Sequence, residues 1–176
     1  MLSKRLEKAI NDQINFEYYS ANIYLAMEAY FAKQNLNGFV NFFKVQIQEE
    51  NFHASKFFDY LNQVGANITI KGFPDPKNDY KSPLEVFEAA LKHEQIVTSR
   101  INNLMSIANE DKDFASIALL QWFVNEQVEE EDTFNNAIQT LKRIGDNPAA
   151  LYLYDQELSS RTFVPPTNTP SAGQNQ

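Results

Sequence analysis

The stretch that decides the fold reads Gln46-Ile47-Gln48-Glu49-Glu50-Asn51-Phe52-His53 and lies within a long helical pattern. Glu50 and His53 are three residues apart, so in an α-helix their side chains lie one turn apart on the same face. That face is otherwise largely apolar, and it consists of Phe39, Phe43, Gln46, Glu50, His53, Phe57, Tyr60 and Val64. A carboxylate on a core face must be paired or bind a metal, because burial of an isolated ion is strongly unfavourable.

Four long helical patterns and one short one follow each other along the chain. Ser3, the Ser82-Pro83 pair, Asp113 and the Asn147-Pro148 pair are N-terminal helix signals. We expect helices over about residues 3–33, 38–65, 82–109, 113–144 and 147–158. The short turn at residues 35–38 makes the second helix antiparallel to the first.

The connection over residues 66–81 is aperiodic and contains Gly72, Pro74 and Pro76. It is long enough to run the length of a bundle, so that the third helix begins at the far end. We therefore predict an all-α fold: a four-helix bundle with a long crossover between helices two and three, plus a short fifth C-terminal helix. An eleven-residue helix is marginal alone in water, so the fifth must dock on the bundle or on a neighbouring subunit. We assign residues 1–160 to one domain and residues 161–176, rich in Pro, Thr, Asn, Ser and Gln, to a disordered tail.

The inward stripes of the long helices repeat one polar scheme. The first and third helices each carry a single inward carboxylate, and the second and fourth each carry a polar pair spaced i, i+3. In chain order these residues are Glu17, Glu50 with His53, Glu94, and Gln127 with Glu130. This is the layout of a dinuclear carboxylate site in a four-helix bundle. Two divalent cations would neutralise the four carboxylates, and the stripes carry no Lys or Arg that could do so instead.

The available ligands restrict the metal. The chain has no cysteine and only two histidines, so carboxylate and imidazole are its strong ligands. An oxygen-rich set with one imidazole suits iron or manganese better than copper or a structural zinc. The alternative for each residue is a helix-edge group or a hydrogen-bonded core polar side chain.

Acidic residues flank the inner ones by one position, namely Glu49, Glu126 and Glu129. Such a run is either a solvated helix face or an auxiliary metal site beside the dinuclear one.

Three ring-bearing residues also lie near the scheme. Tyr24 and Trp122 are core aromatics or electron donors to a metal centre. His93 points about 100° away from Glu94, so we expect it at the surface or at an interface rather than as a ligand.

Composition limits the classes of partner. The 176 residues are 43% hydrophobic with a formal net charge of −8, which predicts one globular domain and argues against a nucleic-acid partner. The N-terminus lacks an apolar signal core, and no stretch approaches the roughly 18 apolar residues of a membrane span. We therefore expect a soluble, cytoplasmic protein without a membrane partner.

Residues 1–160 resemble the bacterial non-haem ferritins of the ferritin-like superfamily. The resemblance rests on the helix lengths, the crossover and the fifth helix, and on Glu17, Tyr24, Glu50, His53, Glu94, Trp122, Gln127 and Glu130. It implies a shell of 24 subunits that oxidises Fe(II) with dioxygen or hydrogen peroxide and stores an Fe(III) mineral inside.

By matching position, Glu17, Glu50 and His53 would hold one iron. Glu50, Glu94 and Glu130 would hold the second, with Glu50 bridging and Gln127 beside the second iron. Residues that match a third iron site of this subgroup are Glu49, Glu126, Glu129 and Glu130, and Tyr24 and Trp122 match the nearby aromatics.

Two related groups differ from this chain. Bacterioferritins are similar but have a second Glu-x-x-His on the fourth helix and a haem-ligating Met on the second, where this chain has Gln127, Glu130 and Phe52. We therefore expect no haem. The DNA-protecting mini-ferritins place the metal site between subunits and lack the terminal helix.

Two other functions remain open at this point. A dinuclear oxidase that acts on an organic substrate would share the ligand set, and a purely structural bundle would bind no metal. Metal analysis and iron accumulation distinguish the three.

Overall fold

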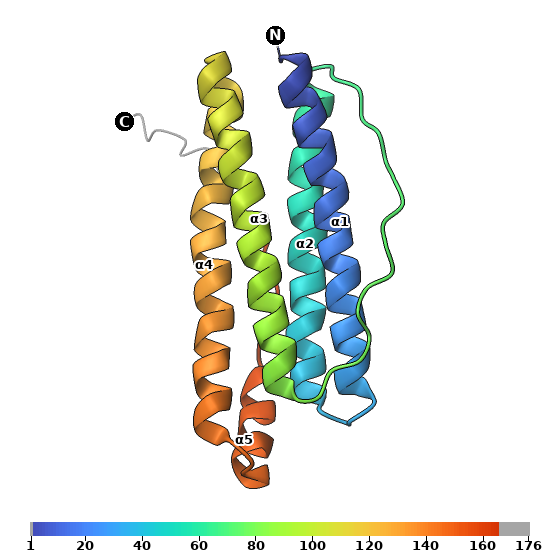
Figure 1. The fold of residues 1–176 in the computed structure, drawn as a ribbon, viewed down its shortest axis with the longest axis vertical. Helices are drawn as coiled ribbons and strands as arrows, with labels where there is room; N and C mark the ends of the chain where they lie inside the picture. Colours follow the sequence, from blue (N-terminus) through green and yellow to red (C-terminus); the bar gives the residue numbers. More distant parts are fainter. Residues whose placement is uncertain (1, 166–176) are drawn as a thin grey trace, which may run out of the picture.

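The structure is a computed structural model, which describes residues 2–165. Over this range the chain forms five α-helices and no strand. The helices are α1 (Lys4–Ala32), α2 (Asn37–Gln63), α3 (Pro83–Asp111), α4 (Phe114–Ile144) and α5 (Pro148–Leu158). Figure 1 shows the four long helices side by side, with α2 antiparallel to α1 and the short α5 at one end of the bundle. The predicted four-helix bundle with a fifth helix is confirmed.

Helices α1, α3 and α4 begin directly after the side chains that were predicted to cap them. Ser3 Oγ accepts a hydrogen bond from the Leu6 backbone at 3.2 Å, and Ser82 Oγ accepts one from the Glu85 backbone at 3.2 Å. Asp113 caps α4 in the same way. Each cap satisfies a backbone N–H that has no partner within its own helix.

The crossover leaves the end of α2 and runs along α1 to the start of α3 (Figure 1). Two side chains of α1 hold it there. The Asn11 amide nitrogen donates to the Asn67 carbonyl at 2.8 Å, and its oxygen accepts from the Thr69 N–H at 2.7 Å. Asn15 makes the same pair of bonds one turn later, to the Thr69 carbonyl and the Lys71 N–H. These bonds satisfy the crossover backbone in place of a strand partner.

Helix α5 docks on the beginning of α2 within the same chain. The buried Asp155 carboxylate accepts hydrogen bonds from the backbone N–H groups of Gly38 at 2.7 Å and Phe39 at 3.1 Å, so it caps α2 from outside. A Cβ on Gly38 would lie 1.6 Å from the Asp155 carbonyl oxygen. Only glycine permits this approach of the two helices.

The core consists of two apolar clusters with a polar layer between them. One cluster, near α5, is rich in phenylalanines: Phe31 stacks on Phe43, and Phe87 packs edge-on against Phe43. The other, near the N-terminus of α1, centres on Phe57 and Phe123, whose rings stack at 3.9 Å. The polar layer therefore has a packed apolar cluster on either side of it along the bundle.

Val64, predicted on the inward stripe, is 42% exposed because α2 ends at Gln63. Of the predicted tail, residues 166–176 lie outside the described residues, whereas Phe163 packs against Phe52 of α2 with ring centroids 6.0 Å apart.

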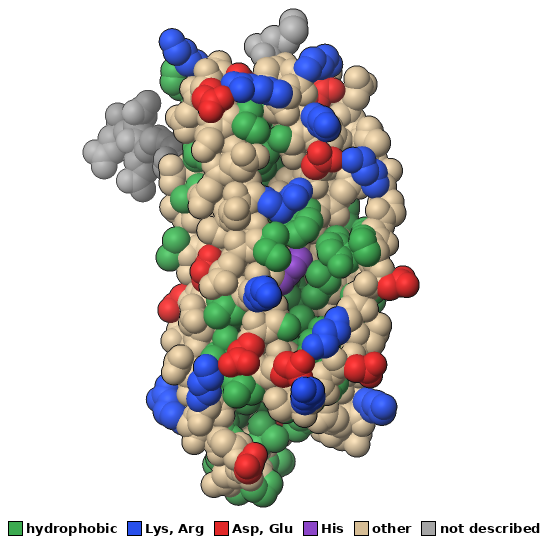
Figure 2. All heavy atoms as spheres, viewed as in Figure 1, with side chains coloured by type: hydrophobic (Ala, Val, Ile, Leu, Met, Phe, Trp, Pro, Cys, Tyr) green, Lys and Arg blue, Asp and Glu red, His purple; other side chains and the backbone are tan. Residues whose placement is uncertain are grey.

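Figure 2 shows apolar side chains gathered in the middle of the face on which α1, α3 and the crossover lie, with charged groups scattered around them. The crossover contributes to the exposed apolar surface, since Ile70 is 60% and Phe73 is 44% exposed. Among residues 2–165, no helix combines the length and apolar character that a membrane span requires.

Candidate metal centre

The side chains of the predicted dinuclear scheme meet in the polar layer of the bundle. They come from all four long helices and are each at most 4% exposed. The residues are Glu17 on α1, Glu50 and His53 on α2, Glu94 on α3, and Gln127 and Glu130 on α4. The sequence periodicity alone placed them on inward faces, and the structure brings those faces together.

One half of the layer contains Glu17, Glu50 and His53. Each offers one ligand atom, and these atoms all lie within 4.8 Å of one another. Glu17 Oε1 accepts a hydrogen bond from Gln13 Nε2 at 2.9 Å, whereas Glu17 Oε2 and Glu50 Oε2 have no hydrogen-bond partner among residues 2–165. His53 Nδ1 is 3.7 Å from Glu50 Oε2, too far for a hydrogen bond. Two buried carboxylate oxygens without partners beside an imidazole fit a bound cation.

The other half contains Glu94 and Glu130, which are held by neutral donors. The Tyr24 hydroxyl and Gln127 Nε2 both donate to the Glu94 carboxylate, the latter at 3.0 Å. Gln46 Nε2 donates to Glu130 Oε2 at 2.9 Å. Neutral donors fix the rotamers of both carboxylates without cancelling their charge.

The pKa values of this layer reflect burial of like charges. Burial raises the pKa of Glu94 to about 7, although hydrogen bonds from Tyr24 and Gln127 lower it. Burial and then the charges of Glu94 and Glu49 raise the pKa of Glu130 to about 8. Burial also raises the pKa of Glu17, and that of Glu50 more strongly. A metal ion that binds these groups must therefore displace protons.

His53 shows the opposite balance. Burial alone would lower its pKa, but the carboxylates of Glu126 and Glu50 outweigh burial and raise the pKa of His53 well above its usual value. A bound metal would replace that proton on the imidazole.

The flanking acidic residues differ in position. Glu126 Oε1 lies 3.7 Å from His53 Nε2, and His53, Glu126 and Glu130 form a second group whose ligand atoms lie within 4.8 Å. Glu49 instead accepts a hydrogen bond from Arg161 Nη2 at 2.8 Å. Glu129 is exposed. The structure thus brings together only part of the predicted auxiliary site.

Both predicted aromatics lie beside the centre. Tyr24 is fully buried, and burial together with the Glu94 charge raises the pKa of its hydroxyl well above the usual value. Trp122 is half-buried, with its ring centroid 5.5 Å from that of His53. Lys56 Nζ lies 4.4 Å from the Trp122 ring centroid, a cation–π contact.

The prediction that His93 lies at the surface is wrong. His93 is 8% exposed, its Nε2 is 2.7 Å from Ser20 Oγ, and its ring stacks on Phe16. Helix α3 packs against both α1 and α4, so its buried arc is wide enough to include two consecutive residues. Burial lowers the pKa of His93 to about 4, and the positive charge of Arg100 adds to this.

Three residues that support the centre were not predicted to do so. Gln13 and Gln46 lie on the inward stripes, four residues before Glu17 and Glu50, and this spacing was a usable signal. Arg100 gave no signal because it lies off the stripe of α3.

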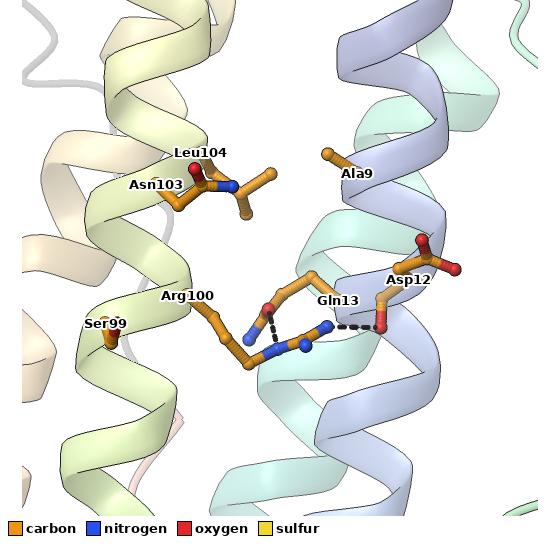
Figure 3. Close-up of a pocket in the computed structure, with 7 residues that line it drawn as sticks. All are labelled: Ala9, Asp12, Gln13, Ser99, Arg100, Asn103 and Leu104. Carbon is orange, nitrogen blue, oxygen red and sulfur yellow. Dashed lines mark hydrogen bonds between the residues drawn. The ribbon is translucent and has the colours of Figure 1, made fainter.

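Figure 3 shows Arg100 of α3 pointing toward Gln13 and Asp12 of α1, and all three residues line a cavity of about 370 Å³. Arg100 Nε donates to Gln13 Oε1 at 2.9 Å, and Arg100 Nη2 donates to the Asp12 carbonyl at 2.9 Å. Because Arg100 occupies the amide oxygen of Gln13, the amide nitrogen faces Glu17. Arg100 thus orients the Glu17 carboxylate through the side-chain amide of Gln13.

Comparison with known proteins agrees with this geometry. A family model described as a ferritin-like domain matches residues 7–144. The chain is 50% identical over 163 residues to proteins named bacterial non-heme ferritin from Staphylococcus aureus and Staphylococcus haemolyticus, covering 93% of this chain and 98% of each relative.

Solved structures agree as well. An open pore ferritin from the hyperthermophilic archaeon Archaeoglobus fulgidus superposes with a TM-score of 0.91 at 42% identity, over 92% of this chain and all of that one. A humanized archaeal ferritin superposes with a TM-score of 0.92 at 43% identity, over 94% of this chain and all of that one. The matching family model, the relatives at half identity and the shared bundle together show that this chain belongs to the ferritin family.

Proposed function

We propose that this protein stores iron: it oxidises Fe(II) at a dinuclear centre inside each subunit and keeps the Fe(III) mineral in a shell of 24 copies. The observation that carries the proposal is the buried polar layer. Four carboxylates and one imidazole from four helices face one another there, and two carboxylate oxygens lack any partner. Two divalent cations are the simplest complement to that charge.

The proposed ligands divide between two iron positions. Glu17, Glu50 and His53 hold the first iron, and their mutual spacing supports this assignment. Glu50, Glu94 and Glu130 hold the second, with Glu50 bridging. Gln127 lies beside the second position, where its donation to Glu94 supports a role in holding that carboxylate rather than binding directly.

Iron is the substrate of the proposed reaction. Two Fe(II) ions each give up one electron, and dioxygen or hydrogen peroxide accepts both electrons. Hard anionic oxygens favour Fe(III) over Fe(II), so the carboxylate ligands favour oxidation. Tyr24 donates its hydroxyl hydrogen to Glu94, and we assign it the additional role of supplying a further electron when dioxygen is reduced by more than the two electrons of the iron pair.

A third iron position is proposed beside the dinuclear centre, with Glu49, Glu126, Glu129 and Glu130 as its ligands. The grouping of Glu126 and Glu130 with His53 supports part of this set. We propose no haem, because Phe52 stands where bacterioferritins carry the haem-ligating Met and the fourth helix carries Gln127 and Glu130 in place of a second Glu-x-x-His.

The shell and its cytoplasmic location are also proposals. Apolar side chains on the surface of α1 and the crossover, among them Leu25, Ile70 and Phe73, line a hollow of about 420 Å³. An exposed apolar patch of this kind is suited to contact between subunits.

The test is an anaerobic titration with Fe(II), followed by exposure to oxygen and size-exclusion chromatography of the product. We expect two tightly bound irons per subunit, rapid oxidation and a large iron-loaded particle. The isosteric Glu94→Gln and Glu130→Gln variants should assemble but lose rapid oxidation. Wild-type oxidation rates in both variants would contradict the assignment, and metal binding without iron accumulation would instead favour a dinuclear oxidase for an organic substrate.

A further inference from the structure

The segment that follows α5 ends on one of the proposed auxiliary iron ligands. Arg161 Nη2 donates to Glu49 Oε2 at 2.8 Å. The Arg161 side chain is 24% exposed and the Glu49 side chain 19%, so the pair is largely shielded from water. Ion pairs in such surroundings are less screened than those at the open surface.

Arg161 is fixed by contacts other than this ion pair. Its carbonyl oxygen accepts a hydrogen bond from Asn41 Nδ2 at 2.9 Å, and its guanidinium lies 4.4 Å from the Phe42 ring centroid. Nη1 also donates to the Phe42 carbonyl at 3.4 Å. The planar guanidinium is therefore held in place before it meets Glu49, which lowers the entropy lost in forming the pair.

Glu49, which pairs with Arg161, does not group with its expected partners. His53, Glu126 and Glu130 lie close enough to share a cation, whereas Glu49 belongs to neither of the two candidate metal groups found among residues 2–165. An arginine side chain stays protonated at any physiological pH. A metal ion that uses Glu49 must therefore either share the carboxylate with a permanent positive charge or displace that charge from Oε2.

We propose that Arg161 is an internal cation that competes with metal for Glu49 and thereby sets the affinity of the auxiliary iron position. The proposal rests on the auxiliary site of the proposed function, and it concerns a residue outside every ligand set. Arg161 weakens metal binding at the auxiliary position and leaves the two central positions unaffected. Metal that does bind there releases Arg161 from Glu49.

The test compares Arg161→Met with Arg161→Lys. Methionine removes the charge but keeps an unbranched side chain against Phe42, and lysine keeps the charge. Arg143→Met is a matched control, because Arg143 is exposed and pairs only with the Gln139 carbonyl among the described residues. Thermal unfolding establishes that each variant is folded.

The readout is equilibrium binding of Zn(II) to the metal-free assembled protein by calorimetry, with anomalous diffraction from Zn(II)-soaked crystals to locate each ion. We expect Arg161→Met to strengthen the auxiliary position about 5- to 10-fold, in line with the strength of a partly shielded ion pair. Arg161→Lys and Arg143→Met should retain the wild-type affinity, and Glu49→Gln should weaken the auxiliary position in either background.

Other outcomes overturn the proposal in distinguishable ways. Unchanged or weaker auxiliary binding in Arg161→Met would show that Arg161 is not a competitor. Zn(II) at the central positions but at no auxiliary position, in wild type and variant alike, would also overturn it while leaving the dinuclear centre intact. Absence of Zn(II) from the central positions would overturn the proposed function itself.

Discussion

The metal-free protein should lose stability as the pH rises from about 6.5 to about 8.5. Burial raises the pKa of Glu94 to about 7 and of Glu130 to about 8, against 4.5 for each in the unfolded chain. At the start of this range the unfolded chain has already released both protons, whereas the folded protein still holds most of both and releases them as the pH rises. A carboxyl group with a raised folded pKa contributes stability that is complete below 4.5 and is lost as the pH rises through the folded value.

The size of the loss follows from proton linkage. Over this pH window the relation gives about 1 kcal/mol for Glu94 and about 2 kcal/mol for Glu130. In a chain of this size each kcal/mol lowers Tm by about 2–4 °C, so Tm should fall by roughly 6–12 °C. His93, with a pKa lowered to about 4, acts in the opposite direction, but only below about 6.5. The window begins there for that reason.

The assay is thermal unfolding of chelator-treated protein, followed by circular dichroism at each pH. The Glu94→Gln/Glu130→Gln double variant should show a smaller pH dependence, and what remains comes from Glu50 and His53, whose pKa values are also raised. Asp59→Asn, which removes an exposed carboxylate, should behave as wild type. Saturating Zn(II) should reverse the trend, because metal binding strengthens as the ligands lose protons. A Tm that stays level or rises in the metal-free wild type, or an equal slope in the double variant, would refute the reasoning.

Three further predictions concern single residues. Tyr24→Phe should slow Fe(II) oxidation measured by stopped-flow absorbance, while Zn(II) stoichiometry stays unchanged because every carboxylate remains; an unchanged rate would remove Tyr24 from the mechanism. Arg100→Met should release the Gln13 amide that orients Glu17. Zn(II) binding measured by calorimetry should then weaken about 2- to 5-fold, which corresponds to the loss of one hydrogen bond, and Arg100→Lys should restore part of the affinity. Gly38→Ala should lower the free energy of unfolding by about 1–3 kcal/mol or more in urea, since its Cβ would clash with α5; Gly72→Ala, with no atom within 4 Å, is the control, and equal effects would contradict the packing argument.

The helical periodicity predicted the residues of the centre because charged side chains are unexpected on a helix face that packs into the core. Glu17, Glu50 and Glu94 each interrupt an apolar stripe, and a stripe at spacings of three and four must face the core whatever its partner helices are. The caps at Ser3 and Ser82 were equally local, which is why the helix starts were predictable. Local rules suffice for features that one helix determines by itself.

Features that depend on the distance between helices were missed. Arg100 and Arg161 lie off the inward stripes; the long side chain of Arg100 contacts Gln13 beside Glu17, and that of Arg161 contacts Glu49, a predicted auxiliary ligand. The burial of His93 was missed because the angle between His93 and Glu94 around the helix does not show how many helices pack against α3. A periodic pattern gives the direction of a side chain but not the width of the buried arc.

The placement of positive charge explains how the centre stays available to metal. Among the residues that the structure describes, no Lys or Arg forms an ion pair or hydrogen bond with Glu17, Glu50, Glu94 or Glu130; the donors that hold three of them are amides and a phenol. A guanidinium in direct contact would supply the complementary charge itself and compete with a metal ion. Neutral donors fix the carboxylates and leave their charge for a metal to neutralise. The bundle can hold that unneutralised charge because packed aromatic clusters on both sides of the layer stabilise the fold independently of it.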